Sequence, residues 1–178
     1  MTYYGAKDLA AAFRTVRGNT LTIANELTEE QYGFSPAPGT RTAGQLLTHI
    51  ALGSKFAEMV HMEKRRSFDG MDFPTLFAGM AAEEKKARSK AEIIALLKEQ
   101  CDRFAGWLES VSDDFLAETV TMPAGASPAA KTRFEMLMGV KEHEMHHRGQ
   151  LMLIQRMLGG VPHLTRQMQE RMAAMAQK

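Results

Sequence analysis

The sequence has only one cysteine, Cys101, and one tryptophan among its 178 residues. A single cysteine excludes a disulfide within the chain and any zinc site built from several thiolates. A metal ion would therefore have to bind nitrogen and oxygen ligands. For that reason the six histidines carry more weight than usual.

The chain also lacks an excess of charge of either sign, since 22 lysines and arginines are balanced by 21 aspartates and glutamates. Without a positive field, neither nucleic acid nor an anionic membrane surface is expected as a partner. No hydrophobic run approaches the roughly 18 residues of a membrane span, and the start of the chain lacks the pattern of a secretory signal. We expect a soluble, cytoplasmic protein.

A chain of 178 residues with 44% hydrophobic residues has enough material for one core. We therefore expect a single domain over residues 1–178. Methionine is frequent, with 14 residues, which could indicate a copper site or an adaptable binding surface. The methionines are spread over several segments, however, and this favours a role as core filler.

Hydrophobic residues spaced by three and four predict an all-α protein with four long helices and no strand of any length. A capping box begins the second helix at Thr42, and Gly159 and Gly160 end the fourth. The predicted helices cover residues 3–27, 42–63, 90–111 and 132–158.

The remaining segments are predicted as connections and a tail. Residues 28–41 and 119–131 contain proline and glycine and show no helical stripe. Residues 64–90 combine a turn with a charged stretch, and we expect a short helix between them. Residues 163–178 are predicted to form a basic, methionine-rich helix that packs on the bundle.

Three histidines lie close together in the fourth predicted helix, in the stretch KEHEMHHRGQ at residues 141–150. At about 100° per residue, His143 and His147 lie about 40° apart in the centre of the apolar face. His146 lies at the edge of this face. The pair spaced i,i+4 therefore points into the core, where imidazoles one turn apart can bind one ion.

The same arithmetic places His49 on the core side of the second predicted helix. A single buried histidine is usually satisfied by hydrogen bonds. Three inward-facing histidines would lose hydration together, and a divalent ion bound by the neutral rings would compensate them. We predict a metal site of His49, His143 and His147, and we interpret His61 and His163 as surface or loop residues.

The stretch from His143 to His147 also matches H-E-x-x-H, the signature of a zinc protease, with Glu144 as the general base. Such a protease needs a third ligand downstream, for example Glu170 or His163, and little chain follows the motif. No predicted strand precedes the motif to hold an extended peptide. His49 supplies a third ligand more simply, so we interpret Glu144 as a surface charge and keep the metalloprotease as the weaker alternative.

Two stretches of the chain resemble the DinB-like (YfiT-like) superfamily of metal-binding four-helix bundles. LTEEQYGFSPAPGTRTAGQLLTHIA, at residues 27–51, resembles the family's proline-rich loop, capping residue and first ligand histidine, here His49. HEMHHRGQLMLIQRMLGGVP, at residues 143–162, resembles its closing helix with the H-x-x-x-H pair, here His143 and His147. The first and last parts of the chain fit the family more loosely.

The resemblance implies an up-down-down-up four-helix bundle, with an additional C-terminal helix here, and a homodimer. It implies a three-histidine site for a divalent ion, with zinc or nickel favoured and iron or another ion as alternatives. Assigned members include thiol S-transferases that use bacillithiol, mycothiol or glutathione, so one hypothesis is transfer of such a thiol to an electrophilic small molecule. The other hypothesis is a non-enzymatic metal-binding or stress-response protein.

Three protein ligands would leave coordination positions open, as in catalytic sites. A thiol from solution could occupy them, and no cysteine of the chain would be needed, since Cys101 is predicted to lie in the core. Arg148 could bind a carboxylate of the thiol or the substrate, with a surface salt bridge as the alternative. Gln150 could donate a hydrogen bond beside the site.

Overall fold

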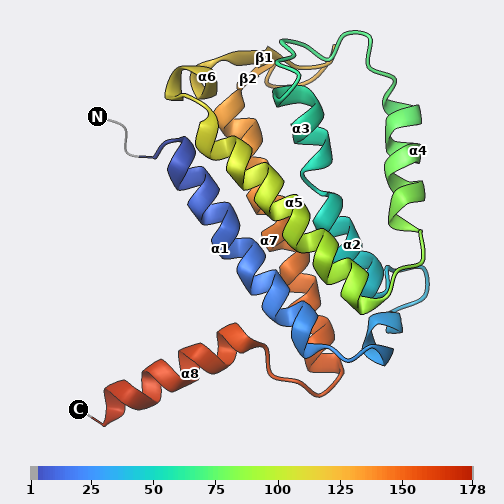
Figure 1. Cartoon of the computed structure of the whole chain (residues 1–178), viewed down its shortest axis with the longest axis vertical. Coiled ribbons are helices and arrows are strands. Elements are labelled where there is room, and N and C mark those ends of the chain that lie inside the picture. The colour runs from blue at the N-terminus through green and yellow to red at the C-terminus, as the bar shows by residue number, and fades with distance from the viewer. Residues whose placement is uncertain (1–3, 178) are drawn as a thin grey trace.

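Four helical arms lie side by side in the computed structural model, which describes residues 4–177 (Figure 1). Residues 3 and 178, which belong to the predicted first and last helices, lie outside this range. The arms form an all-α four-helix bundle, as the sequence predicts, and one arm consists of two helices in succession. The helices are α1 (Ala6–Glu26), α2 (Ala43–Leu52) with α3 (Lys55–His61), α5 (Lys90–Ser110) and α7 (Arg133–Met157).

The direction of the arms gives the predicted up-down-down-up order. α1 and α7 run one way, whereas the α2–α3 arm and α5 run the other way (Figure 1). Because the second and third arms are parallel, the chain must return along the bundle between them. α4 (Phe73–Glu84) makes this return along the outside of the bundle and contains no buried residue. It is the short helix predicted within residues 64–90.

Thr42 caps α2 as predicted. Its Oγ1 accepts a hydrogen bond from the Gln45 N–H at 3.2 Å, and the Gln45 side chain accepts one from the Thr42 N–H at 3.0 Å. The prediction of one helix over residues 42–63 is wrong, because the chain breaks between α2 and α3. At the break the Gly53 N–H bonds to the Ile50 carbonyl at 3.2 Å, in a tighter turn than that of an α-helix.

The prediction of no strand is wrong for one short segment. β1 (Thr119–Thr121) pairs with β2 (Ala130–Thr132) in an antiparallel sheet that covers both ends of the predicted link 119–131 and the residue after it. Three residues on each strand are too few to show a period of two in the sequence. Val120 is fully buried and packs in a cluster with Phe68. Two further short elements lie in the connections, η1 (Glu30–Gly33) and α6 (Asp113–Ala117).

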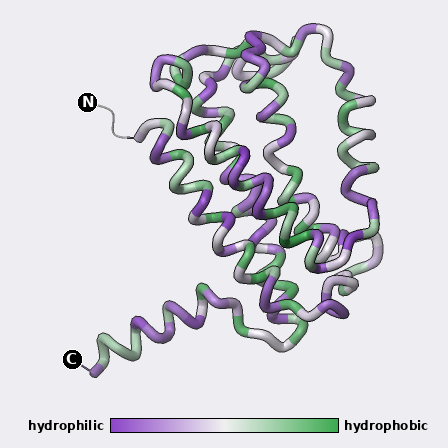
Figure 2. Tube along the Cα trace, viewed as in Figure 1, coloured by the Kyte–Doolittle hydropathy of each residue, from purple (hydrophilic) through white to green (hydrophobic). Residues whose placement is uncertain are grey.

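Hydrophobic residues recur along each arm (Figure 2), and those that face inward form the core. One cluster contains Leu47 and Leu97, and another contains Phe13 and Phe104. Cys101 lies in the second cluster and is 7% exposed, as its predicted place in the core requires. Within residues 4–177, no helix combines the length and the apolar content needed to cross a membrane.

α8 (His163–Ala176) leaves the bundle, which corrects the prediction that this segment packs on it (Figure 1). The chain turns away after α7 because Gly159 adopts a φ of 81°, which favours glycine, and Pro162 precedes the new helix. His163, in the first turn, is the buried residue of α8. Further along, hydrophobic residues continue in solvent (Figure 2), namely Met168, Met172 and Met175.

Candidate metal centre

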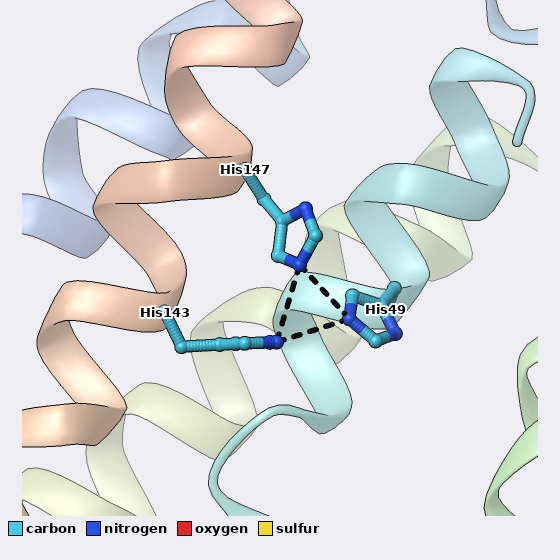
Figure 3. A group of neighbouring side chains, drawn as sticks. All are labelled: His49, His143 and His147. Carbon is cyan, nitrogen blue, oxygen red and sulfur yellow. Dashed lines mark hydrogen bonds between the residues drawn. The ribbon is translucent and has the colours of Figure 1, made fainter.

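The three predicted ligand histidines come together between α2 and α7, with their Nε2 atoms facing one another (Figure 3). His143 and His147 extend from successive turns of α7, and His49 extends from α2. The His49 Nε2 lies 3.1 Å from each of the other two Nε2 atoms, which are 3.2 Å apart. The structure thus brings together all three residues that the sequence nominates.

Hydrogen bonds on the far side of two rings fix which nitrogen carries the proton. The Glu84 carboxylate accepts from the His49 Nδ1 at 2.9 Å, and the Gln150 Oε1 accepts from the His147 Nδ1 at 2.9 Å. A neutral imidazole with its proton on Nδ1 has a lone pair on Nε2. His49 and His147 therefore present lone pairs to each other at 3.1 Å, and no hydrogen bond between them can satisfy this arrangement.

A divalent cation between the rings would bind the facing lone pairs of His49 and His147. With metal–nitrogen bonds of about 2.0–2.1 Å, two ligands of one ion lie roughly 3.0–3.4 Å apart. The three Nε2 atoms are separated by 3.1–3.2 Å. Imidazole nitrogen binds zinc, nickel and iron alike, so the donor set fits a divalent ion as a class.

Burial favours the neutral form of all three rings. It lowers the pKa of His143 to about 4, with further contributions from the neighbouring His147 and His49. Burial likewise lowers the pKa of His49 and that of His147, although hydrogen bonds with Glu84 and Gln150 act in the opposite direction. Neutral rings near pH 7 are the form that binds a metal ion.

Glu84, the last residue of α4, is a site residue that the sequence analysis missed. Besides binding His49, its carboxylate accepts hydrogen bonds from the Nε and an Nη of Arg41. Burial raises the pKa of Glu84, but the contacts with Arg41 and His49 outweigh it and lower the pKa below its usual range. In the sequence nothing distinguishes Glu84 from Glu83, which pairs with Lys86 and Arg88 instead.

Gly53, at the break between α2 and α3, leaves room for the His143 ring. A Cβ at this position would lie 3.0 Å from the His143 Nδ1 and 3.2 Å from the Ile50 carbonyl oxygen. Glycine is required here because of the limited space and not because of its backbone conformation, since the φ of Gly53 is −60° and suits any residue. The helix break therefore forms one side of the histidine site.

Two cavities border the site. His49 and His143 line one of about 350 Å³ among α2, α3, α4 and α7. Gln150 lines a larger one of about 620 Å³. Arg41 and Glu84 contribute to the walls of both. An ion held by the triad would therefore lie next to open space.

Glu144 is not a surface charge, and that interpretation is corrected. Its side chain is 2% exposed and accepts hydrogen bonds from the Arg17 Nε at 2.9 and 3.1 Å and from the Thr20 Oγ1 at 2.7 Å. Both of these partners lie on α1. With its oxygens bound there, Glu144 is not placed to act as the general base of an H-E-x-x-H protease.

Arg148 borders neither cavity, so the prediction that it binds a carboxylate at the site receives no support. Burial lowers the pKa of Arg148 more than the nearby Glu144 raises it. Gln150 does contact the site, but toward His147 it is an acceptor instead of the predicted donor. Its amide nitrogen lies 3.3 Å from the Nε2 of the exposed His146.

His61 and His163 are buried, which corrects their interpretation as surface or loop residues. Arg133 donates a hydrogen bond to the His61 Nδ1 at 3.1 Å, and the His163 Nε2 lies 3.1 Å from the Asn19 Oδ1. Neither belongs to the group of potential metal ligands found among the described residues. Each has the ordinary role of a lone buried histidine with a protein partner.

Comparisons with known proteins agree with this architecture. The model of the DinB superfamily matches residues 12–151. A DinB-like protein from Bacillus subtilis is 20% identical, with a TM-score of 0.63 over 86% of this chain and 92% of the other. YfiT from Bacillus subtilis is 15% identical, with a TM-score of 0.67 over 90% and 91%. No curated protein matches.

Two of the similar solved structures, YfiT and ClbS, have different functional descriptions. YfiT is described as a probable metal-dependent hydrolase with an unusual four-helix bundle topology. The colibactin self-resistance protein ClbS, solved in complex with double-stranded DNA, is 15% identical, with a TM-score of 0.65 over 88% of this chain and 98% of its own. Because ClbS has this fold and was solved with DNA, the fold by itself does not exclude nucleic acid as a partner. At such identities the likeness concerns the fold alone.

Proposed function

The chain belongs to the DinB superfamily, and we propose that it is a metal-dependent enzyme that transfers a low-molecular-weight thiol to an electrophilic small molecule. One observation carries the proposal, which is that the histidine triad opens onto a cavity. His49 and His143 form part of the wall of the 350 Å³ cavity. Among the described residues, the group of potential ligands has only three members. Structural metal sites are usually closed by a fourth protein ligand, whereas catalytic sites keep an open position.

A bound divalent ion would lower the pKa of a thiol or water molecule beside it and so supply a nucleophile near neutral pH. The chain's own part is to hold the ligands, because Glu84 orients His49 and Gln150 orients His147. Apolar side chains, among them Phe77, also line the cavity.

The thiol must come from solution. Cys101 lies in the core of the bundle, and burial raises the pKa of its thiol, so it is an inert residue. Bacillithiol, mycothiol and glutathione are the candidate thiols. In the reaction the sulfur–carbon bond forms, the leaving group departs with its electron pair, and the thiol proton passes to solvent. Hydrolysis would use water in place of the thiol, and YfiT is described as a probable metal-dependent hydrolase.

The first experiment measures metal content by mass spectrometry for the purified protein and the variants His49→Ala, His147→Ala and His146→Ala. We expect about one divalent ion per chain, lost in the first two variants. His146→Ala is the matched control, since His146 lies on the same helix and is exposed, and it should keep the ion. An ion retained without His49 would contradict the proposed ligand set.

The second experiment compares thiol transfer by the metal-loaded and the chelator-treated protein with each of the three thiols. Transfer that depends on the metal supports the proposal. Metal-dependent hydrolysis of the same electrophile without thiol would favour a hydrolase. If the loaded protein does neither, the non-enzymatic alternative, a metal-binding or stress-response protein, replaces the proposal.

A further inference from the structure

The 350 Å³ cavity beside the triad is lined by two chemically different groups of side chains. One group is His49 and His143. The other is apolar and includes Phe56 of α3 and Phe77 and Met80 of α4. The charged side chains that line the cavity, Arg41 and Glu84, are paired with each other. The cavity therefore offers apolar surface next to the triad and no unpaired charge among its lining residues.

The phenylalanines of this apolar group belong to a larger aromatic array. The rings of Phe56 and Phe77 have centroids 6.1 Å apart and planes inclined by 27°. Phe56 also stacks on Phe68 at 5.9 Å and 5°, and Phe68 is buried. Phe73 stacks on Phe77 at 5.9 Å and 22°. The four rings thus form one contiguous cluster with interplanar angles from 5° to 39°. The buried Phe68 anchors this cluster, and its members Phe56 and Phe77 line the cavity.

Phe77, the most exposed ring of the array, does not help to fill the core. Phe77 is 52% exposed, and α4 contains no buried residue. Apolar side chains left in water beside a pocket commonly mark a binding surface, because a ligand that covers them gains roughly 25 cal/mol per Å². Ring faces select planar partners, because offset stacking adds to the gain from burial.

We propose that this cavity binds the uncharged aromatic part of the electrophilic substrate, stacked on Phe56 and Phe77 with its reacting carbon toward His49 and His143. The cavity is large enough for a substituted aromatic ring, since an engineered cavity of about 150 Å³ holds benzene and this one measures about 350 Å³. The reactive role of the ligand rests on the proposed function, whereas its binding does not.

Binding is tested with the metal-loaded full chain labelled with ¹³C at its methionine methyl groups. The probes are nitrobenzene and nitrocyclohexane, which have similar volumes but differ in the aromatic ring. Met80 lines the cavity, and its signal is identified with Met80→Leu. We expect nitrobenzene to shift the Met80 signal through its ring current and to bind more tightly than nitrocyclohexane, by roughly tenfold.

Phe77→Leu keeps the apolar volume and removes the ring, so the preference for nitrobenzene should be lost. The control is Leu153→Ala, an exposed apolar residue that lines only the larger cavity, and it should leave nitrobenzene binding unchanged. Equal binding of the two probes, or a preference that survives Phe77→Leu, would overturn the proposal.

A reaction assay separates this proposal from the proposed function. With 1-chloro-2,4-dinitrobenzene and the active thiol, Phe77→Leu should raise KM by roughly tenfold and leave kcat nearly unchanged. Selective nitrobenzene binding without any thiol transfer would refute the proposed function and leave the cavity assignment standing. Thiol transfer whose KM does not respond to Phe77→Leu would refute the cavity assignment and leave the function standing.

Discussion

The Arg17 guanidinium and the Glu144 carboxylate form an ion pair in the buried centre of the bundle, with Nε to oxygen distances of 2.9 and 3.1 Å. Arg17 also donates to the Leu97 carbonyl at 2.7 Å and to the Ile50 carbonyl at 3.2 Å. One side chain of α1 therefore bonds to α2, α5 and α7. Ile50 follows His49 and Glu144 follows His143 in the sequence, so this network ties together the helices that carry the ligands.

Glu144→Gln should destabilise the metal-free protein by roughly 3 kcal/mol, because it leaves the buried Arg17 charge without its partner. Urea unfolding measures the change. Glu142→Gln is the matched control, since Glu142 is exposed on the same helix, and it should alter stability by less than about 0.5 kcal/mol. An H-E-x-x-H protease makes a different prediction, namely that Glu144→Gln abolishes casein cleavage and leaves stability unchanged.

Glu84→Ala should weaken metal binding by roughly 10- to 100-fold, because His49 loses the acceptor that orients its ring. A competition titration with a metal indicator measures the affinity. The neighbouring Glu83 pairs with Lys86 and Arg88 outside the site, so Glu83→Ala should bind metal as the wild type does. Similar losses in both variants would mean that the effect comes from damage to α4 and not from His49.

Gly53→Ala should weaken metal binding by about tenfold, or roughly 1.4 kcal/mol, because the new Cβ would displace the His143 ring. Gly106→Ala provides the comparison within α5, where a Cβ meets nothing within 4 Å. That variant should keep its metal affinity and gain up to about 1 kcal/mol of stability from the better helix former. Normal metal affinity in Gly53→Ala would show that the ring can shift without cost.

His61 should make the metal-free protein less stable in acid. Burial, and next the charge of Arg133, lower its pKa to about 4 in the folded protein, against about 6.5 in the unfolded chain. Between these values the unfolded chain binds a proton that the folded chain does not. The stability from His61 is therefore complete above the unfolded pKa and is lost as the pH falls toward the folded pKa.

The size of this effect is about 2 kcal/mol at pH 5 relative to pH 7.5. It is measured as the difference in unfolding free energy between the wild type and His61→Gln at the two pH values, which cancels the contribution of the other histidines. If the difference is the same at both pH values, His61 is not the group that titrates.

The sequence predicted the features that repeat with the period of a helix. Four arms, the cap at Thr42 and the inward direction of His49, His143 and His147 all follow from spacing along one helix. The structure confirms the bundle and brings the three histidines together. Their role as metal ligands remains a prediction.

Contacts between segments that lie far apart in the sequence could not be predicted from the sequence. Glu144 was misjudged because its partner Arg17 lies 127 residues away and has no pattern that indicates pairing. Glu84 binds His49 from a helix whose polar and apolar residues are not cleanly segregated, so its direction could not be inferred. The break at Gly53 depends on the His143 ring opposite it, which only the assembled bundle reveals.

The crossover helix α4 has a consequence for how this scaffold can diversify. It supplies Phe77, Met80 and Glu84 to the site, and yet none of its residues is buried in the core. An exchange of α4 alone would therefore replace Phe77 and Met80 without removing a buried residue, whereas Phe68, in the loop before it, is buried against Val60 of α3 and would have to stay. Under the proposed function, substrate preference would be set by side chains of this connecting helix, whereas the three histidines lie on two of the arms.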